Sequence, residues 1–344
     1  MVSSNNPFTS LQELASKQLL TIPECYCVNH QPPISLDDQN NPNISPIPLL
    51  NMATLTSQEL FSTCKEWGIF QLVNHGVNSS LIEKLKYEIE KFYKLPIEEK
   101  MKYKLRPGEV EGYGQTILRS ADQKIDWADR FFMIINPLHL RKSHLLPELP
   151  SSLRETLEAY IQETEKLGMN LLKMMGETLR IDKEEIGEMF EDGLETMRMT
   201  FYPPCPKPEL VMGLTPHSDA TGITILLQVN GVEGLQVKKD GVWLPVKILP
   251  EALVVNVGDV LEILSNGIFK SIEHRAAVNS EKERMSIAMF YSPKLEVEIG
   301  PLSCLIDAEN PPLYKRIIME KYVKDFFTRK LNGKSYLDAM KINN

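Results

Sequence analysis

Two histidines and an aspartate in the second half of the chain have the types and spacing of a metal-dependent oxidation site. His217 and Asp219 are two residues apart, so on an extended strand their side chains point to the same face. His274 comes from a later predicted strand and adds a second imidazole. Two imidazoles and one carboxylate on one face of an ion form the facial triad of non-haem Fe(II) oxygenases, which leaves open positions on the metal. The sequence therefore predicts an iron site made by these three residues.

Arg284 and Ser286 form a second candidate group shortly after His274. They are also two residues apart and share one face of a predicted strand. The arginine presents a planar fork that matches a carboxylate, and the serine hydroxyl adds one more donor. A single His-x-Asp pair or a single late histidine often arises by chance, whereas the ordered combination with Arg-x-Ser is much harder to produce accidentally. The two groups together predict a metal centre beside an anion-binding site.

A resemblance that runs from end to end supports this interpretation. The chain resembles the plant Fe(II)/2-oxoglutarate-dependent dioxygenases, and it is most similar to the branch with codeine and thebaine O-demethylase-like and senescence-related oxygenase-like proteins. Besides the residues named above, four stretches carry the resemblance: WGIFQLVNHGV at 67–77, DWAD at 126–129, YPPCP at 202–206 and GKSYLD at 333–338.

The resemblance implies an enzyme that uses Fe(II), 2-oxoglutarate as co-substrate and O2, with ascorbate as the expected reductant. It implies that 2-oxoglutarate chelates the iron, that Arg284 and Ser286 hold its distal carboxylate, and that Tyr202 donates its hydroxyl to it. Thr200 stands where the family normally has asparagine, which changes one expected contact with the co-substrate. The expected reaction is hydroxylation or oxidative demethylation of a small plant specialised metabolite, such as an alkaloid, flavonoid or coumarin, with release of succinate and CO2.

The resemblance also places four residues around the substrate: Arg130, Phe132, Arg198 and Phe290. The two phenylalanines would stack on a planar or polycyclic substrate, although ordinary core packing explains them equally well. The two arginines would bind a substrate carboxylate or phenolate, or else form surface ion pairs.

The elements that must position these residues change character along the chain. Residues 1–46 are polar and rich in proline and asparagine, and the family resemblance implies that they wrap the core as an N-terminal arm. Residues 47–195 are expected to form a largely helical region packed on the core, with helices over 79–93 and 152–179. Ser152 with Glu155 predicts a capping box for the second of these helices. A glycine-rich loop is expected over 108–115.

From residue 196 to about 300 the pattern changes to short strands with turn signals, including a hairpin that turns at 239–241. Two further strands are expected over 252–257 and 260–264. This pattern predicts an α+β fold with a double-stranded β-helix (jelly roll) core, supporting helices and a helical N-terminal region. Residues 301–344 should form C-terminal helices and a lid, to which Leu337 and Met340 are expected to contribute.

Composition excludes several classes of partner. A net charge of −8 argues against nucleic acid or an anionic membrane, because both require a basic surface. We find no apolar run long enough to cross a membrane and no N-terminal signal pattern. Five scattered cysteines fit free thiols in a reducing cytosol better than a disulfide framework. We therefore expect a cytoplasmic protein, a monomer, that acts on a small molecule and binds neither nucleic acid nor membrane.

Two alternative functions stay open at this point. An Fe(II) oxidase of the same fold that does not use 2-oxoglutarate would carry the same Arg-x-Ser pair, and succinate release would distinguish it. A non-catalytic metabolite-binding protein would keep only a vestigial iron site, which anaerobic iron titration would test. A structural zinc site is a weaker alternative, because structural zinc prefers four closed ligands that usually include cysteine.

Overall fold

The computed structural model describes residues 10–17, 21–28, 47–115 and 123–342 of the chain. Most of the predicted N-terminal arm lies outside the described residues. The part of the arm that is described includes α1 (Leu11–Ser16), which is fixed to the core by the buried carboxylate of Asp129. Asp129 accepts hydrogen bonds from Ser10 Oγ at 2.6 Å and from the backbone N–H groups of Leu11 and Gln12 at 2.9 and 2.8 Å.

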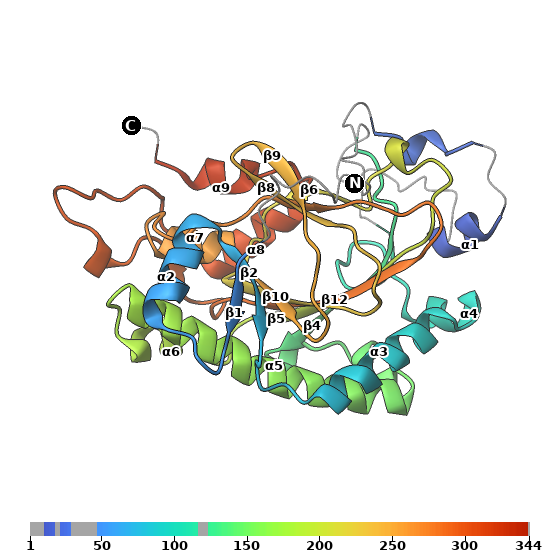
Figure 1. Ribbon diagram of the computed structural model, residues 1–344, viewed down its shortest axis with the longest axis horizontal. Helices are drawn as coiled ribbons and strands as arrows, with labels where there is room; N and C mark the ends of the chain where they lie inside the picture. Colours follow the sequence, from blue (N-terminus) through green and yellow to red (C-terminus); the bar gives the residue numbers. More distant parts are fainter. Residues whose placement is uncertain (1–9, 18–20, 29–46, 116–122, 343–344) are drawn as a thin grey trace.

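Two sheets form the core of the molecule. The larger sheet has eight strands in the order β1-β2-β10-β7-β12-β5-β4-β3, and the smaller has four in the order β6-β11-β8-β9. The bounds of the larger sheet are β1 Leu49–Asn51, β2 Ile69–Val73, β3 Gly112–Gly114, β4 Asp129–Asn136, β5 Glu195–Tyr202, β7 Ile223–Gln228, β10 Leu253–Val257 and β12 Arg284–Tyr291. Those of the smaller sheet are β6 Leu214–His217, β8 Leu235–Lys239, β9 Val242–Pro245 and β11 His274–Ala276. Figure 1 shows the smaller sheet lying over the larger one.

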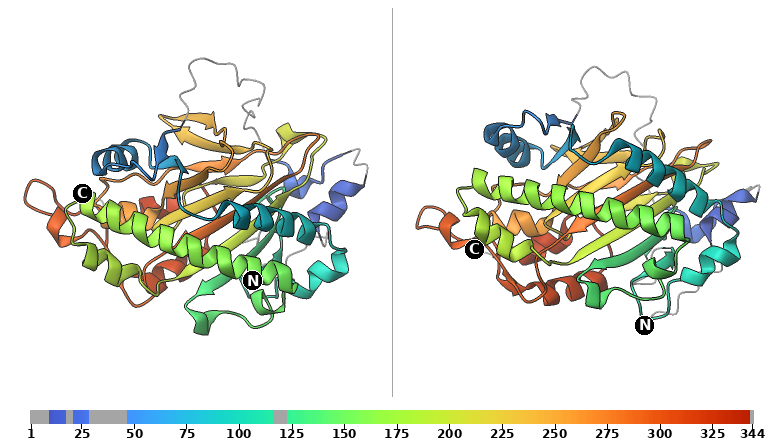
Figure 2. Two further views of the ribbon diagram at one scale, coloured as in Figure 1. Left: turned by 60° about the horizontal axis from the view of Figure 1, so that its bottom comes forward. Right: turned by 90° about the horizontal axis from the view of Figure 1, so that it is seen from below.

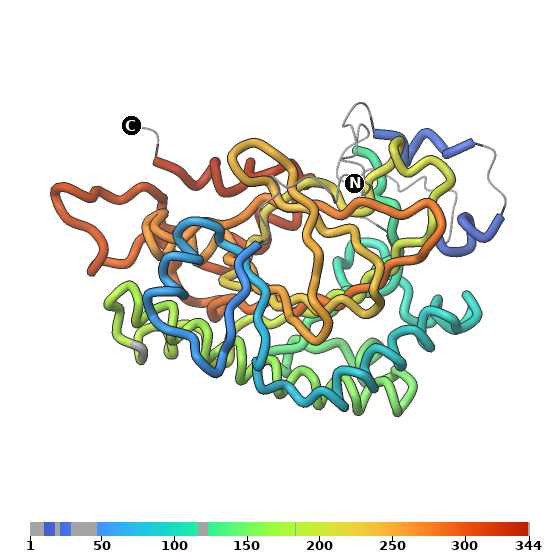
Figure 3. The backbone as a smooth tube through the Cα atoms, in the orientation of Figure 1, coloured from blue at the N-terminus to red at the C-terminus, as the bar shows by residue number. Residues whose placement is uncertain are grey.

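Helices cover the outer face of the larger sheet. Figure 2 shows α5 lying lengthwise across this sheet with α3 beside it. The apolar side of α5 is buried because its large residues recur at helical spacing, among them Leu157, Leu171 and Met175. The other helices are α2 Ser57–Glu66, α3 Ser79–Tyr93, α4 Ile97–Lys100, α5 Ser151–Thr178, α6 Lys183–Phe190, α7 Asp259–Leu264, α8 Met319–Thr328 and α9 Ser335–Met340. In Figure 3, α1 and α9 lie toward opposite ends of the molecule.

The predicted fold, the predicted helix over 79–93 and the predicted hairpin are confirmed. The α+β fold with a jelly-roll core is present, as is the helix over residues 79–93. The β8–β9 hairpin turns at Asp240 and Gly241, whose φ angles of 49° and 82° suit an Asp-Gly turn. Within the described part of the chain, no helix combines the length and the apolar character that crossing a membrane requires.

Three local predictions are wrong. Residues 260–264 belong to helix α7 and not to a strand, because a short apolar run buried on all sides has no periodicity that separates the two. The predicted loop over 108–115 contains β3, which pairs with β4. Ser152 does not cap α5, whose N-cap is Pro150 without a side-chain hydrogen bond. Ser152 Oγ donates instead to Glu88 Oε1 at 2.7 Å, so a contact with α3 replaces the local cap.

Candidate active site

Three buried side chains meet where β6 and β11 lie side by side in the smaller sheet. His217 ends β6, His274 begins β11, and the two residues are direct partners in the antiparallel ladder. Asp219 follows β6 by two residues. One ligand atom of each residue can be chosen so that all three lie within 4.8 Å of one another. Asp219 Oδ1 is 3.4 Å from His217 Nε2 and 3.7 Å from His274 Nε2. The predicted triad residues are therefore brought together on one side of a point that could hold a metal ion.

Backbone carbonyl groups orient both imidazole rings. His217 Nδ1 lies 2.8 Å from the carbonyl oxygen of Thr215, and His274 Nδ1 lies 3.2 Å from that of Ile272. Because a carbonyl oxygen only accepts hydrogen bonds, each Nδ1 carries the ring proton. The lone pair of each Nε2 is then free and faces Asp219. His217 Nε2 is buried without a hydrogen-bond partner among the described residues, as expected for an atom that faces a metal position.

The charges around the cluster also suit metal binding. Burial, followed by the positive charge that His217 would carry, lowers the pKa of His274 to about 4, so its imidazole is neutral at physiological pH. Burial alone would raise the pKa of Asp219, but the two histidines and the hydrogen bond from Thr224 outweigh it and hold this pKa well below its usual range. A neutral imidazole and an ionised carboxylate are the protonation states that a metal requires.

Two residues absent from the predicted site, Thr224 and Asn256, fix the carboxylate of Asp219. Thr224 Oγ1 donates to Asp219 Oδ2 at 2.6 Å, and Asn256 Nδ2 donates to the same oxygen at 2.9 Å. The two donors are buried cross-strand partners on β7 and β10. Because Oδ2 already accepts two hydrogen bonds, Oδ1 is the oxygen left for a metal. A polar residue inside each of the apolar runs ITILLQ and LVVNV was the available signal in the sequence.

A pocket lined by His274 and Asp219 contains the predicted co-substrate residues. Arg284 and Ser286 on β12 pair directly with Tyr202 and Thr200 on β5, so all four residues belong to two adjacent strands. The Arg284 guanidinium lies 5.0 Å from the centre of the Tyr202 ring.

Arg284 has the features of a buried anion receptor. The residue is 2% exposed, its Nε has no hydrogen-bond partner, and no carboxylate of the described residues lies within ion-pair distance of it. Burial lowers its pKa from the ordinary value, which reflects the cost of keeping this charge away from water. A buried cation of this kind is stabilised by an anionic ligand. The pocket therefore fits a carboxylate group placed next to the metal position.

A second cavity, of about 160 Å³, adjoins the first and shares Asp219 with it. All four predicted substrate residues line it. Phe290 and Arg198 are in contact, with the guanidinium 5.3 Å from the ring centre. Phe132 packs at 5.9 Å, between ring centres, against Phe327 of α8. His217 also lines this cavity, so a molecule bound there would lie next to the metal position.

The C-terminal wall of this cavity is not made by the predicted lid residues. Leu337 and Met340 of α9 are buried in the main core, and neither lines the cavity. Residues of α8 and the segment after it form the wall instead: Val323, Phe326, Phe327, Arg329 and Leu331. Both helices carry an apolar face, and the sequence alone did not indicate which of them faces the cavity and which faces the core.

Comparisons with known proteins agree with this geometry. Residues 194–293 match the family model of the 2OG-Fe(II) oxygenase superfamily, and residues 43–151 match that of the non-haem dioxygenase in morphine synthesis N-terminal region. Codeine O-demethylase of Papaver somniferum is 48% identical, and the match covers 97% of this chain and 96% of that protein. Oxoglutarate-dependent flavonoid 7-O-demethylase 1 of Ocimum basilicum is 45% identical, with 97% and 91% covered. The crystal structure of JOX2 with 2OG, Fe and JA is similar with a TM-score of 0.90 at 35% identity, covering 98% of both chains.

Proposed function

Because the chain belongs to the 2OG-Fe(II) oxygenase superfamily, we propose that it hydroxylates or oxidatively demethylates a small aromatic plant metabolite. The chain is an Fe(II)- and 2-oxoglutarate-dependent dioxygenase, as the sequence predicted. The observation that carries the proposal is the pairing of two adjoining pockets at Asp219. One of them holds a buried arginine that has no carboxylate of the described residues within ion-pair distance, and the other is lined by aromatic rings.

Seven of the predicted residues would bind iron or 2-oxoglutarate. His217, Asp219 and His274 would hold Fe(II) through Nε2, Oδ1 and Nε2, with Thr224 and Asn256 fixing the carboxylate. The residues of the β5–β12 pocket would bind 2-oxoglutarate: Arg284, Ser286, Tyr202 and Thr200. Arg284 with Ser286 would receive the distal carboxylate of the co-substrate, because an arginine fork binds a carboxylate through two parallel hydrogen bonds.

When bound, Fe(II) with 2-oxoglutarate and O2 would supply the oxidant: one oxygen atom would enter a substrate C–H bond, the other would enter succinate, and CO2 would leave. The chain itself binds and orients. It places the substrate carbon beside His217 and Asp219, and its buried walls keep bulk water away from the reacting atoms. If the oxidised carbon is an O-methyl or N-methyl group, the product breaks down to formaldehyde and the demethylated metabolite.

The cavity walls favour a planar substrate with a polar edge. Phe132, Phe290 and Phe327 offer aromatic faces, and Arg198 offers a cation beside one of them. Arg130 lines the same cavity. We infer that a phenolate, carboxylate or methoxy oxygen of the substrate faces these arginines while its rings stack between the phenylalanines. Methylated alkaloids and flavonoids combine these features, which agrees with the two demethylases reported above.

We also propose that the protein acts as a cytoplasmic monomer with an arm over 1–46 and a largely helical region over 47–195, which also adds strands β1 to β4 to the larger sheet. A catalytic core over 196–300 and C-terminal helices over 301–344 would follow. All five cysteines are free thiols, which suits a reducing compartment.

The test is a turnover screen of the full chain with Fe(II), ascorbate, 2-oxoglutarate and O2. Methoxylated alkaloids, flavonoids and coumarins are supplied singly, and succinate, formaldehyde and product mass are measured. We expect succinate in equal amount to a product that has gained one oxygen atom or lost one CH2 unit. A His274→Ala variant serves as the inactive control. An oxidised product formed without succinate would refute the use of 2-oxoglutarate and identify an oxidase of the same fold.

A further inference from the structure

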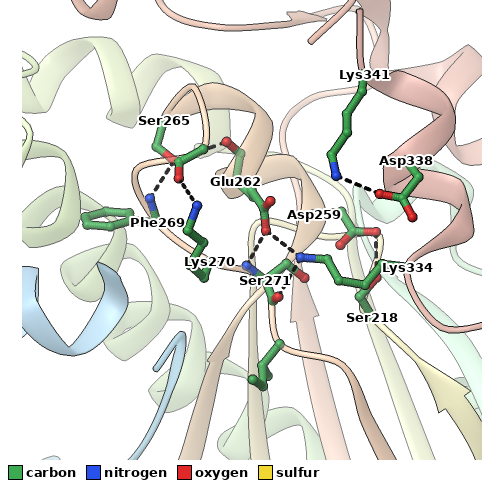
Figure 4. A network of polar contacts seen from close by, with 12 residues as sticks. Ser218, Asp259, Glu262, Ser265, Phe269, Lys270, Ser271, Lys334, Asp338 and Lys341 are labelled. Carbon is green, nitrogen blue, oxygen red and sulfur yellow. Dashed lines mark hydrogen bonds and ion pairs between the residues drawn. The ribbon is translucent and has the colours of Figure 1, made fainter. Parts of the chain in front are cut away.

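Lys334 belongs to the GKSYLD stretch and lies in a buried polar network to which the proposed reaction assigns no role (Figure 4). Its ammonium group is 2.8 Å from Glu262 Oε2 and donates to the carbonyl oxygen of Ser271 at 2.9 Å. The Glu262 carboxylate on α7 is buried and accepts two further hydrogen bonds, from the backbone N–H of Ser271 at 2.6 Å and from the Tyr314 hydroxyl at 2.8 Å. Lys334 is the cation that compensates this buried carboxylate.

The residue before Lys334 is hydrogen-bonded to the loop that carries the triad. The Gly333 N–H donates to the Pro216 carbonyl at 2.9 Å, and the Ser218 N–H donates to the Gly333 carbonyl at 3.3 Å. The two bonds form a β-bridge between Gly333 and His217. They therefore flank one proposed iron ligand and precede the next, Asp219.

Helix α7 holds the same loop from the other side. The Asp259 N–H donates to the Asp219 carbonyl at 2.7 Å, and Ser218 Oγ donates to Asp259 Oδ2 at 3.0 Å. The loop is thus fixed to the first residue of α7, and Lys334 is fixed to Glu262 one turn further along the same helix. Figure 4 shows the contacts of Ser218 with Asp259 and of Lys334 with Glu262, both on α7.

The segment that leads into Gly333 forms the C-terminal wall of the substrate cavity. Phe326, Phe327, Arg329 and Leu331 line that cavity, whereas no described residue of 301–344 lines the co-substrate pocket. A displacement of this segment would consequently open the substrate side and loosen the His217 loop while leaving Arg284 and Ser286 on β12 in place.

We propose that Lys334 is a positioning residue that couples the C-terminal cavity wall to the metal-binding loop through its ion pair with Glu262. The inference rests on the proposed function in taking His217 and Asp219 as iron ligands. Without the ammonium group, Glu262 is left as a buried carboxylate lacking its cation, and the α7 anchor of the C-terminal segment is weakened. Coupling of this kind is reciprocal, so metal bound at the loop stabilises the Gly333 contacts, and loss of those contacts weakens metal binding.

The test compares Lys334→Met with Lys341→Met in the full chain. Lys341 pairs with Asp338 at 2.7 Å on the same C-terminal segment, but both side chains are half exposed and the pair does not touch the loop, which makes it a matched control. Amide hydrogen exchange is measured by mass spectrometry for residues 214–219 and 329–337 without metal. Co(II) binding is then titrated anaerobically.

In Lys334→Met we expect exchange in both segments to accelerate about tenfold or more and the Co(II) dissociation constant to rise by about three- to tenfold, while Lys341→Met behaves like the wild type. We further expect bound Co(II) to slow hydrogen exchange at the Gly333 amide in the wild type. In Lys334→Met this slowing should be absent. Acceleration confined to 329–337, or equal effects of both substitutions, would overturn the proposal.

Two further controls keep the result interpretable. If Lys334→Met does not fold by circular dichroism, Glu262→Gln removes the same ion pair with almost no change in shape and should give the same paired acceleration. If the wild type does not bind Co(II) at all, the proposed metal site fails, whereas the exchange of 214–219 still decides whether Lys334 holds the loop.

Discussion

Replacing Thr224 by valine tests the orientation of the triad carboxylate directly. Valine keeps the branched shape of threonine inside strand β7 and removes only the hydroxyl that donates to Asp219 Oδ2 at 2.6 Å. The carboxylate then keeps a single side-chain donor on that oxygen, from Asn256 at 2.9 Å. It becomes free to rotate and to present either oxygen to the histidines. We expect the metal affinity to fall. Thr224 also lines the co-substrate pocket, but Arg284 and Ser286 on β12 are unchanged by the substitution.

The size of the effect follows from the charge on the acceptor. A hydrogen bond to a charged group contributes about 1.5–3 kcal/mol, whereas a neutral one contributes about 1 kcal/mol. Since about 1.4 kcal/mol corresponds to a factor of ten, the metal dissociation constant should rise by about ten- to a hundredfold, the usual range for groups that orient metal ligands. Asn256→Leu should act in the same direction but less strongly, because its bond is longer. The two substitutions should not be additive, because both donors share one oxygen.

The assay is an anaerobic Co(II) titration followed by absorbance, with folding checked by circular dichroism. Thr164→Val is the matched control: this buried threonine donates to the Tyr160 carbonyl at 2.8 Å within α5, far from the site in sequence and in a different layer. It undergoes the same chemical change without touching Asp219. A Thr224→Val affinity equal to that of the wild type, or an equal loss in Thr164→Val, would refute the argument.

Three further expectations concern the pocket, the cavity and stability. Arg284→Ala should raise the KM for 2-oxoglutarate about thirtyfold or more, since losing a charge-assisted pair in a buried site costs about 2–5 kcal/mol. An equal rise in the KM of the second substrate would contradict the assignment. Phe290→Ala should raise the KM of an aromatic substrate at least several-fold, because stacking contributes about 0.5–1.5 kcal/mol beyond burial, and a wild-type KM would exclude stacking there. Burial and the charge of Glu165 raise the pKa of Glu195 from 4.5 to about 8, so the folded state holds this proton more tightly and loses stability as the pH rises through that window. Glu195→Gln should therefore raise the unfolding temperature at pH 9 but hardly at pH 5, whereas an equal gain at both would reject this cause.

The residues that we propose for the chemistry could be named from the sequence because their spacing is local. His217 with Asp219, and Arg284 with Ser286, lie two residues apart, and an extended backbone places such pairs on one face whatever surrounds them. The structure then adds what spacing does not contain. His274 is opposite His217 only because β11 pairs with β6 in that register, and register depends on the whole sheet.

The supporting residues could not be predicted in the same way. Thr224 and Asn256 are 32 positions apart in the sequence and meet only through the pairing of β7 with β10. Helix α7 was mistaken for a strand because its short run is buried on every side, which removes the periodicity that identifies a helix. That error also concealed the relation of Glu262 to Asp259, since helix α7 places them one turn apart, whereas the predicted strand began after Asp259.

Thr200 is a residue for which both the sequence pattern and the pairing of strands in the structure are informative. It is the one co-substrate position at which the chain departs from the expected asparagine, and the structure places it on β5 between Ser286 on β12 and Arg130 on β4. It lines both the co-substrate pocket and the substrate cavity. A shorter side chain at this position removes an amide from the wall between the two pockets and leaves a single hydroxyl there. We therefore expect the departure from the family pattern to change the space shared by the two substrates as well as one hydrogen bond to 2-oxoglutarate. Arg130 and Arg198 line the same substrate cavity.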